Sequence, residues 1–275
     1  MQEFICVTCG TQFTASKSAP DNCPICDDER QYVPPSGQRW TTLTALRRAH
    51  RNAVRRLEPQ LLGIGTEPAF AIGQRALLVQ TPEGNVLWDC VALLDDATVD
   101  VIRALGGISA IAISHPHYYT TMVEWARAFG AAVYLHAADS EWVMRPDPAI
   151  RFWDGENQDL PGGLTLVCCG GHFEGGTVLH WPAGAGGRGA LLTGDILQVV
   201  ADRRHVSFMR SYPNLIPLGA PAIERIVRAI EPYPYDRVYG AWWDRCIESD
   251  GKSAVARSAA RYLAAIGANA SAPSH

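Results

Sequence analysis

Short apolar runs separated by turn residues dominate the chain from residue 65 onward, a pattern typical of strands that alternate with helices. Strands are expected at the runs AFAI, ALLVQT, NVLWDC, AIAI, AVYLH, LTLVCC, TVLHW, GALLTGD and RVYG. Apolar residues at helical spacing predict helices over residues 97–105, 122–129, 222–230 and 252–266, and a short helix near 139–143. Two strand-rich stretches, each followed by helices, predict an α/β domain in which two sheets pack together with helices outside.

The N-terminal part of the chain has a different pattern. Residues 1–38 are polar and carry four cysteines, which predicts a small separate module. The segment 39–64 has the apolar spacing of a basic helix that ends near Pro59, and it is expected to link this module to the main domain of residues 65–268. Residues 269–275 are expected to form a frayed tail.

Composition and charge exclude several classes of protein. Hydrophobic residues make up 47% of the 275 residues and charged residues 19%, a balance typical of a globular protein with a large core. The net charge of −4 and the scattered basic residues do not form the positive surface that nucleic acid requires. No apolar run approaches the roughly 20 residues that span a bilayer, and the first residues do not resemble a signal peptide. We therefore expect a cytoplasmic protein without a membrane or nucleic-acid partner.

Two cysteine pairs near the N-terminus have the spacing of a metal site. Cys6 and Cys9 form one C-x-x-C knuckle, and Cys23 and Cys26 form a second. Four thiolates at this spacing can bind one ion tetrahedrally, as in the zinc ribbons and rubredoxins that the module resembles. Zinc in a structural role is the expected occupant, and iron for electron transfer remains open. The module is too short to bury a core, so the metal must supply much of its folding free energy.

Three histidines and one aspartate follow predicted strands in the main domain. His115 and His117 lie in the turn after the run AIAI, His172 lies in a glycine-rich loop, and Asp195 ends the run LLTGD. Turns at strand ends are where open α/β sheets bind ligands. Imidazoles suit zinc, copper, iron or nickel, and an added carboxylate can leave a position open for substrate. A second metal site is therefore predicted here.

The order of these motifs resembles the metallo-β-lactamase fold superfamily. The resemblance covers residues 65–266 and consists of a strand followed by HxHxx and a helix, then a GGH loop, then an apolar strand that ends in Gly-Asp. It implies an αβ/βα sandwich with the metal site at the sheet edges and, in most members, hydrolysis with one or two zinc or iron ions. Asp89 matches the aspartate that the superfamily places near the metals, behind the ligands.

The chain departs from the superfamily at two ligand positions. Tyr119 and Thr120 stand where the motif HxHxDH has its aspartate and last histidine. After the final core strand, residues 239–243 include Trp242 but no histidine. The resemblance thus predicts a divergent member without the second-metal ligands. It is expected to hold one zinc or iron ion with His115, His117, His172 and Asp195.

Catalysis without the missing aspartate needs other polar groups. Tyr118, Tyr119 and Glu174 are the nearby candidates, together with Asp195. A tyrosine, whose pKa is about 10 in water, is a better acid than base at neutral pH, so either tyrosine is expected to donate a proton or to stabilise an oxyanion. The alternative is that both tyrosines only pack.

The segment 201–218 and a late tryptophan suggest how substrate binds. The segment contains Arg203, Arg204, Arg210 and Tyr212, and arginine forks bind carboxylate or phosphate groups. Arg210, Tyr212 and Trp242 are the substrate-binding candidates, and the predicted substrate is a small, anionic ester or thioester. The alternative is that the arginines are surface charges on a loop.

Three functions remain open from the residues alone. The first is a metal-dependent hydrolase with a single ion in the main domain and a small molecule as substrate. The second is a mononuclear non-haem iron oxidoreductase, similar to persulfide dioxygenases, in which His115, His172 and Asp195 form the facial triad. The third is a non-catalytic metal-binding scaffold. The oligomeric state is open, a homodimer included.

Overall fold

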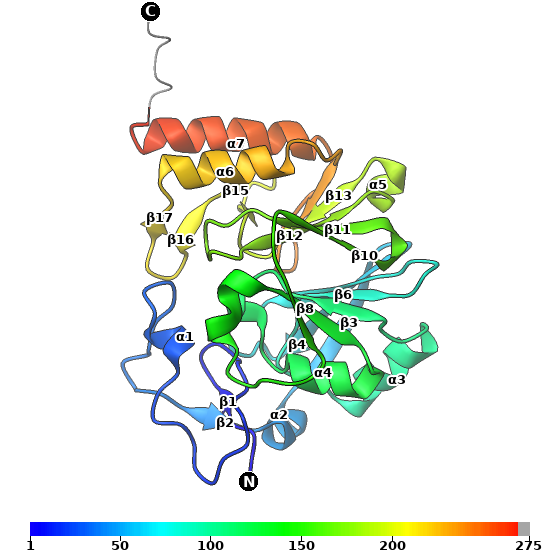
Figure 1. The fold of residues 1–275 in the computed structure, drawn as a ribbon, viewed down its shortest axis with the longest axis vertical. Helices are drawn as coiled ribbons and strands as arrows, with labels where there is room; N and C mark the ends of the chain where they lie inside the picture. The colour runs from blue at the N-terminus through cyan, green and yellow to red at the C-terminus, as the bar shows by residue number, and fades with distance from the viewer. Residues whose placement is uncertain (269–275) are drawn as a thin grey trace, which may run out of the picture.

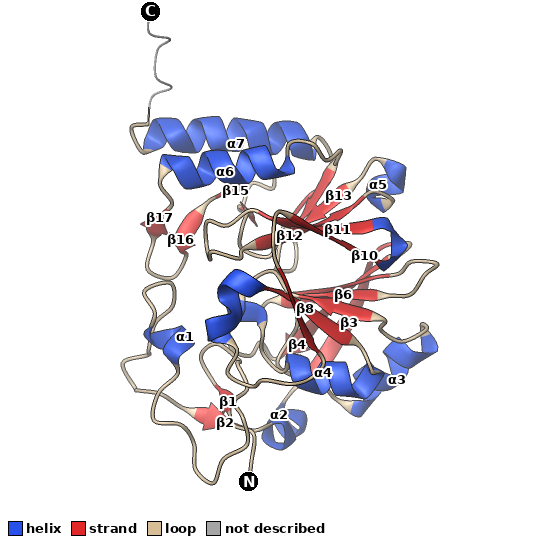
Figure 2. Cartoon of the chain, in the orientation of Figure 1, coloured by secondary structure: helices blue, strands red, loops and turns tan. Residues whose placement is uncertain are grey.

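The computed structural model describes residues 1–268 and shows two sheets packed face to face (Figures 1 and 2). The predicted tail of residues 269–275 lies outside the described residues. The first sheet has the order β3 (Arg51–Glu58), β4 (Leu61–Glu67), β5 (Arg75–Val79), β6 (Val86–Trp88), β7 (Ala110–Ala112), β8 (Ala132–His136), β9 (Ile150–Trp153). The second has the order β10 (Asn157–Leu160), β11 (Leu164–Cys168), β12 (Thr177–Trp181), β13 (Ala190–Leu192), β18 (Arg237–Tyr239), β19 (Cys246–Ile247).

Helices cover the outer face of each sheet (Figure 1). The first sheet is covered by α3 (Asp96–Ala104) and α4 (Met122–Phe129), and the second by α6 (Ala220–Ile230) and α7 (Gly251–Ala265). The side chain of Asp95 begins α3 by accepting a hydrogen bond from the Thr98 backbone N–H, as expected of an N-cap. The predicted αβ/βα sandwich is confirmed.

Alternate residues of strand β5 pack into two different apolar layers. Leu77 and Val79 of β5 pack between the sheets, against residues such as Leu166 and Leu179, whereas Leu78 packs under the helices of the first sheet. A strand buried on both faces has a continuous apolar sequence, and successive side chains point to opposite faces. The run ALLVQT therefore predicted this strand correctly.

The predicted linker helix over residues 39–64 is wrong. The helix α2 (Leu43–Ala49) ends at His50, and the chain then forms the hairpin of β3 and β4. In this hairpin Arg51 lies opposite Glu67, and β3 is at the edge of its sheet, where charged side chains are tolerated. Pro59 lies in the hairpin turn instead of ending a helix. The main sheet consequently begins at β3, earlier than residue 65.

Two further segments differ from the sequence prediction. The run AFAI at residues 69–72 is a loop, in which Ala71 has a φ of 54°. The arginine-containing segment forms two short hairpins, β14 (Gln198–Val199) with β15 (Val206–Ser207) and β16 (Met209–Ser211) with β17 (Ile216–Pro217). Strands β9, β10 and β19 were not predicted: β10 has the polar sequence NQDL, which lacks an apolar signal, and β19 is only two residues long.

The four-cysteine module lies against one end of the sandwich (Figure 1). Its elements are β1 (Ile5–Cys6), α1 (Pro24–Asp27) and β2 (Trp40–Thr41), and β1 pairs with β2. The backbone N–H of Gln12 donates to the carbonyl of Thr120, directly before α4. The remaining short elements are α5 (Gly184–Gly187) and the 3-10 helices η1 (Pro116–Tyr118), η2 (Ala137–Trp142) and η3 (Pro161–Gly163). Within residues 1–268, no helix combines the length and apolar character needed to cross a membrane.

Candidate metal centres

The four cysteines of the N-terminal module converge on one point. The Sγ atoms of Cys6 and Cys26 are 3.6 Å apart, and those of Cys9 and Cys23 are 3.7 Å apart. Two thiolates on a tetrahedral zinc ion are expected about 3.8 Å apart, given Zn–S bonds of about 2.3 Å. All four thiols are free and buried. Their arrangement fits one closed four-thiolate metal site.

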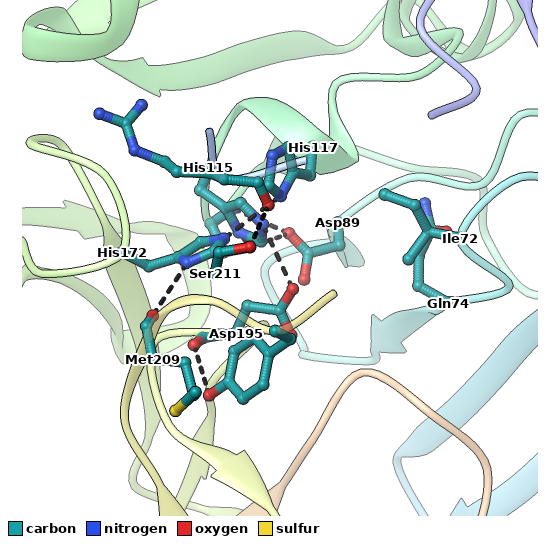
Figure 3. Close-up of polar contacts among 12 residues, drawn as sticks. Ile72, Gln74, Asp89, His115, His117, His172, Asp195, Met209 and Ser211 are labelled. Atoms are coloured by element: carbon teal, nitrogen blue, oxygen red, sulfur yellow. Dashed lines mark hydrogen bonds and ion pairs between the residues drawn. The ribbon is translucent and has the colours of Figure 1, made fainter. Parts of the chain in front are cut away.

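The histidines and Asp195 converge in the main domain (Figure 3). His115 and His117 follow β7 and flank Pro116, His172 lies between β11 and β12, and Asp195 follows β13. One ligand atom from each of these buried residues lies within 4.8 Å of every other. Strand ends from both sheets meet at this edge, so the predicted convergence is confirmed.

A hydrogen-bond chain orients the ring of His115. The Oδ1 atom of Asp89 accepts from the backbone N–H and the hydroxyl of Ser114, each at 2.8 Å. The same hydroxyl oxygen lies 2.8 Å from Nδ1 of His115. Because Ser114 gives its hydroxyl hydrogen to Asp89, Nδ1 of His115 must carry the proton and donate to Ser114. The Nε2 atom of His115 is then left with a free lone pair, as a metal ligand requires.

The ring of His172 is placed in a similar way. Nδ1 of His172 donates to the carbonyl of Met209 at 3.1 Å, which leaves Nε2 of His172 free (Figure 3). This Nε2 is 3.2 Å from Nδ1 of His117. Two nitrogen ligands of a tetrahedral zinc ion are expected about 3.3 Å apart, given Zn–N bonds of about 2.0–2.1 Å.

Buried polar atoms without hydrogen-bond partners show which kind of group the cluster can bind. Among the described residues, Nε2 of His115 and Oδ1 of Asp195 have no hydrogen-bond partner, and the other carboxylate oxygen of Asp195 is 3.6 Å from Nε2 of His115. Unpaired polar atoms in a protein interior are costly. A cation bound between them would satisfy both, so the donor set fits a metal ion.

The electrostatics of the cluster agree with this fit. Burial lowers the pKa of His115 and His117 well below the usual value and lowers the pKa of His172 to about 4, so the imidazoles are neutral at physiological pH. Burial also raises the pKa of Asp195 to about 7. Neutral imidazoles are the form that binds metal, and a nearby cation would favour the ionised carboxylate of Asp195.

The predicted catalytic residues lie in different surroundings. The ring of Tyr118 packs against that of His115, with 4.3 Å between centroids. Burial, and then the charge of Asp195, raise the pKa of Tyr118 well above its usual value, so its hydroxyl stays protonated and can donate a hydrogen bond. Tyr119 points away from the cluster, and its hydroxyl donates to the carbonyl of Asp139. Glu174 is exposed at the surface. The positions of Tyr119 and Glu174 do not fit the catalytic roles expected for them.

A cavity of about 230 Å³ opens onto the cluster. Its lining residues are Thr8, Gln31, Tyr32, Ala71, Ile72, His117, His172, Asp195, Gln198, Tyr212, Pro213 and Trp242. Tyr212 and Trp242 lie where the sequence placed them, in the wall. Arg210 does not, because its Nε donates to Glu29 of the four-cysteine module at 2.5 Å. Arg203 and Arg204 line a different surface depression. No arginine or lysine of the described residues lines the cavity, so the reason for expecting an anionic substrate is removed.

Several residues of the site were missed from the sequence, one behind the ligands and the others in the cavity wall. Ser114 directly precedes His115, and this position was a usable signal. Gln31 and Tyr32 carried no signal, because they reach the cavity only through the docking of the four-cysteine module. Ile72 belongs to the run AFAI, whose apolar pattern predicts a strand where the structure has a loop.

Comparisons with known proteins agree with this architecture. No model of a protein family matches the sequence. The Bacillus subtilis (strain 168) protein described as "Uncharacterized protein YmaE" is 51% identical over 268 residues, which cover 97% of each chain.

Solved structures with the same fold are metallo-β-lactamases. The DIM-1 enzyme matches with a TM-score of 0.59 and 14% identity over 78% of this chain and 98% of that chain. The enzyme from Pontibacter korlensis matches with a TM-score of 0.54 and 14% identity, over 78% and 99% of the two chains. One from Cronobacter sakazakii has a TM-score of 0.51 and 20% identity, over 78% and 92%. The chain therefore belongs to one family with Bacillus subtilis YmaE and has the fold that defines the metallo-β-lactamase superfamily.

Proposed function

We propose that this protein is a metal-dependent hydrolase with one catalytic ion in the main domain. The observation that carries the proposal is the set of buried, unpartnered ligand atoms of His115 and Asp195, beside His117 and His172, at the floor of a cavity. A zinc ion held there with an open coordination position would lower the pKa of a water to about 7 and polarise a carbonyl oxygen.

The chain's own residues would divide the work as follows. His115, His117, His172 and Asp195 hold the ion, and Asp89 orients His115 through Ser114. The protonated hydroxyl of Tyr118, which also lacks a partner among the described residues, is available as a hydrogen-bond donor next to Asp195. Tyr212 and Trp242 contact the substrate from the wall.

The cavity limits the substrate to a small molecule. A volume of about 230 Å³ accommodates a small ester or thioester. Among the residues that the structure describes, the wall offers amide, hydroxyl, aromatic and aliphatic groups but no cationic side chain. These features favour a substrate that carries no charge on the part away from the metal, because a buried anionic group there would lack a paired charge.

Metal content and hydrolysis of a small-ester panel test the proposal together. The wild-type chain is expected to bind one ion at each centre, with zinc at the main site, and to hydrolyse at least one ester or thioester. His117→Ala is expected to lose the main-site ion and at least about 100-fold in kcat/KM, because the ligand set is broken. His205→Ala changes a histidine that pairs with Asp202 on the surface and serves as the matched control.

Other outcomes would point elsewhere. Unchanged hydrolysis in His117→Ala with a normal circular-dichroism spectrum would contradict the proposal. Iron at the main site together with oxygen consumption would support the non-haem iron oxidoreductase, whose facial triad His115, His172 and Asp195 can supply. Bound metal with neither hydrolysis nor oxygen consumption would support the non-catalytic metal-binding scaffold.

A further inference from the structure

The four-cysteine module forms one wall of the main-site cavity. Thr8, Gln31 and Tyr32 come from this module, and they line the cavity together with the metal ligands His172 and Asp195. The module is therefore part of the candidate active site, in addition to being a metal-stabilised unit.

The hairpin of β16 and β17 holds this wall in place. The Nδ2 atom of Asn214 donates to the carbonyls of Glu29 and Gln31, at 2.9 and 2.8 Å. The hydroxyl of Ser211 donates to the carbonyl of Arg30 at 3.1 Å. The same hairpin supplies the Met209 carbonyl that accepts from His172 (Figure 3). One short hairpin thus positions both a metal ligand and the module's wall.

The four-cysteine site anchors the wall from the other side. Cys26 lies in α1, and the segment that follows turns back at once, since the N–H of Gln31 donates to the carbonyl of Asp28. The guanidinium carbon of Arg30 lies 4.2 Å from the centroid of Phe173, next to His172. The wall is consequently held between two metal centres.

The side chains of Gln31 and Tyr32 are available to a ligand. Gln31 is only 6% exposed and lines the cavity, yet its side-chain amide makes no hydrogen bond to another described residue. A nearly buried, unpaired amide is a polar group that a ligand can satisfy. Tyr32 is 47% exposed and lines the same cavity.

We propose that Gln31 and Tyr32 determine specificity at the main site and select a small, uncharged carbonyl compound with an amide or similar hydrogen-bonding group beside its reactive bond. The proposal rests on the metal-dependent hydrolase proposed above. The amide group of the substrate would pair with the Gln31 side chain, and Tyr32 would cover the substrate from the mouth.

Binding of two hydroxamates to the full-length, zinc-loaded protein tests this without relying on turnover. Acetohydroxamate and N-acetylglycine hydroxamate present the same zinc-binding group, and only the second carries a further amide group beside it. Calorimetry is expected to show that wild type binds the second about tenfold more tightly, the effect of about one buried hydrogen bond. In Gln31→Leu the two hydroxamates should bind about equally tightly, with acetohydroxamate binding and zinc content unchanged.

Two further variants complete the test. Gln2→Leu changes an exposed glutamine of the same module and should keep the preference. Tyr32→Ala alters an exposed side chain, so the variant is expected to fold, and it should reduce the preference at least about threefold. The proposal is overturned if wild type shows no preference, if the preference survives in Gln31→Leu, or if Tyr32→Ala keeps it in full. Ester hydrolysis by wild type is measured separately, so a failure of the proposed function is distinguishable.

Discussion

Individual residues in the main-domain site are oriented by hydrogen bonds on the side away from the metal position. His115 depends on Ser114, and His172 depends on the Met209 carbonyl. Such contacts fix which ring nitrogen keeps its lone pair, and they hold the ring in place before metal arrives.

Ser114→Ala is expected to weaken metal binding at the main site by about 10–100-fold, because His115 loses the partner that fixes its tautomer. Competition with a chromophoric chelator would measure this affinity. Ser109→Ala is the matched control, since the Ser109 hydroxyl donates to the carbonyl of Asn85, before a strand, and its loss should leave the affinity unchanged. Equal affinities for both variants would show that Ser114 has no orienting role.

Some residues of the site could be predicted from the sequence, and others could not. His115 and Asp195 carry ligand chemistry in their own side chains and end apolar runs, so a single sequence was enough to select them. The role of Arg210 depends on which acid lies within reach, and that acid is Glu29, 181 positions away in the chain. An ion pair between two modules cannot be predicted from the spacing of residues near either partner.

Elements could be predicted where both faces of a strand are buried. β7 has a purely apolar sequence because it is enclosed by helices on one side and the second sheet on the other. β3 is an edge strand with exposed arginines, and its pattern was equally compatible with a helix. Its identity as a strand depends on pairing with β4, which a periodicity argument does not include.

The turn after β13 shows how closely these elements approach at the site. Gly194 has a φ of 52°, and a Cβ atom there would lie 2.3 Å from the hydroxyl oxygen of Ser114. Gly194→Ala is therefore expected to displace Ser114 and to lose the main-site ion. It should also cost more than the about 1–2 kcal/mol of the left-handed backbone alone. Urea unfolding and zinc content would measure the two effects.

A glycine in open space provides the control for that substitution. Gly107 has a φ of 77°, and a Cβ atom there would meet nothing within 4 Å. Gly107→Ala should lose only the backbone contribution, about 1–2 kcal/mol, and keep its zinc. If Gly194→Ala bound zinc as well as Gly107→Ala, the crowding at Ser114 would be unimportant.

At the scale of the whole molecule, the two modules are joined by a buried polar network as well as by the cavity wall. Arg145 is 7% exposed and pairs with Glu124 of α4 at 2.5 Å. It also donates to Gln12 and lies 3.6 Å from Glu3, both in the four-cysteine module. A charge buried this far depends on all of its partners.

Arg145→Met is expected to lower the free energy of unfolding by about 2–4 kcal/mol, because it leaves Glu124 without its positively charged partner beneath the module. Arg127→Met removes an arginine that also pairs with a carboxylate, Asp147, but is itself 60% exposed, so it should cost only about 0–1 kcal/mol. Urea unfolding followed by circular dichroism would compare the two, and limited proteolysis of the native variants would show whether the module is released. Equal, small losses would mean that docking depends on the wall contacts of Asn214 and Ser211 instead. In that case the hydroxamate preference should persist in Arg145→Met.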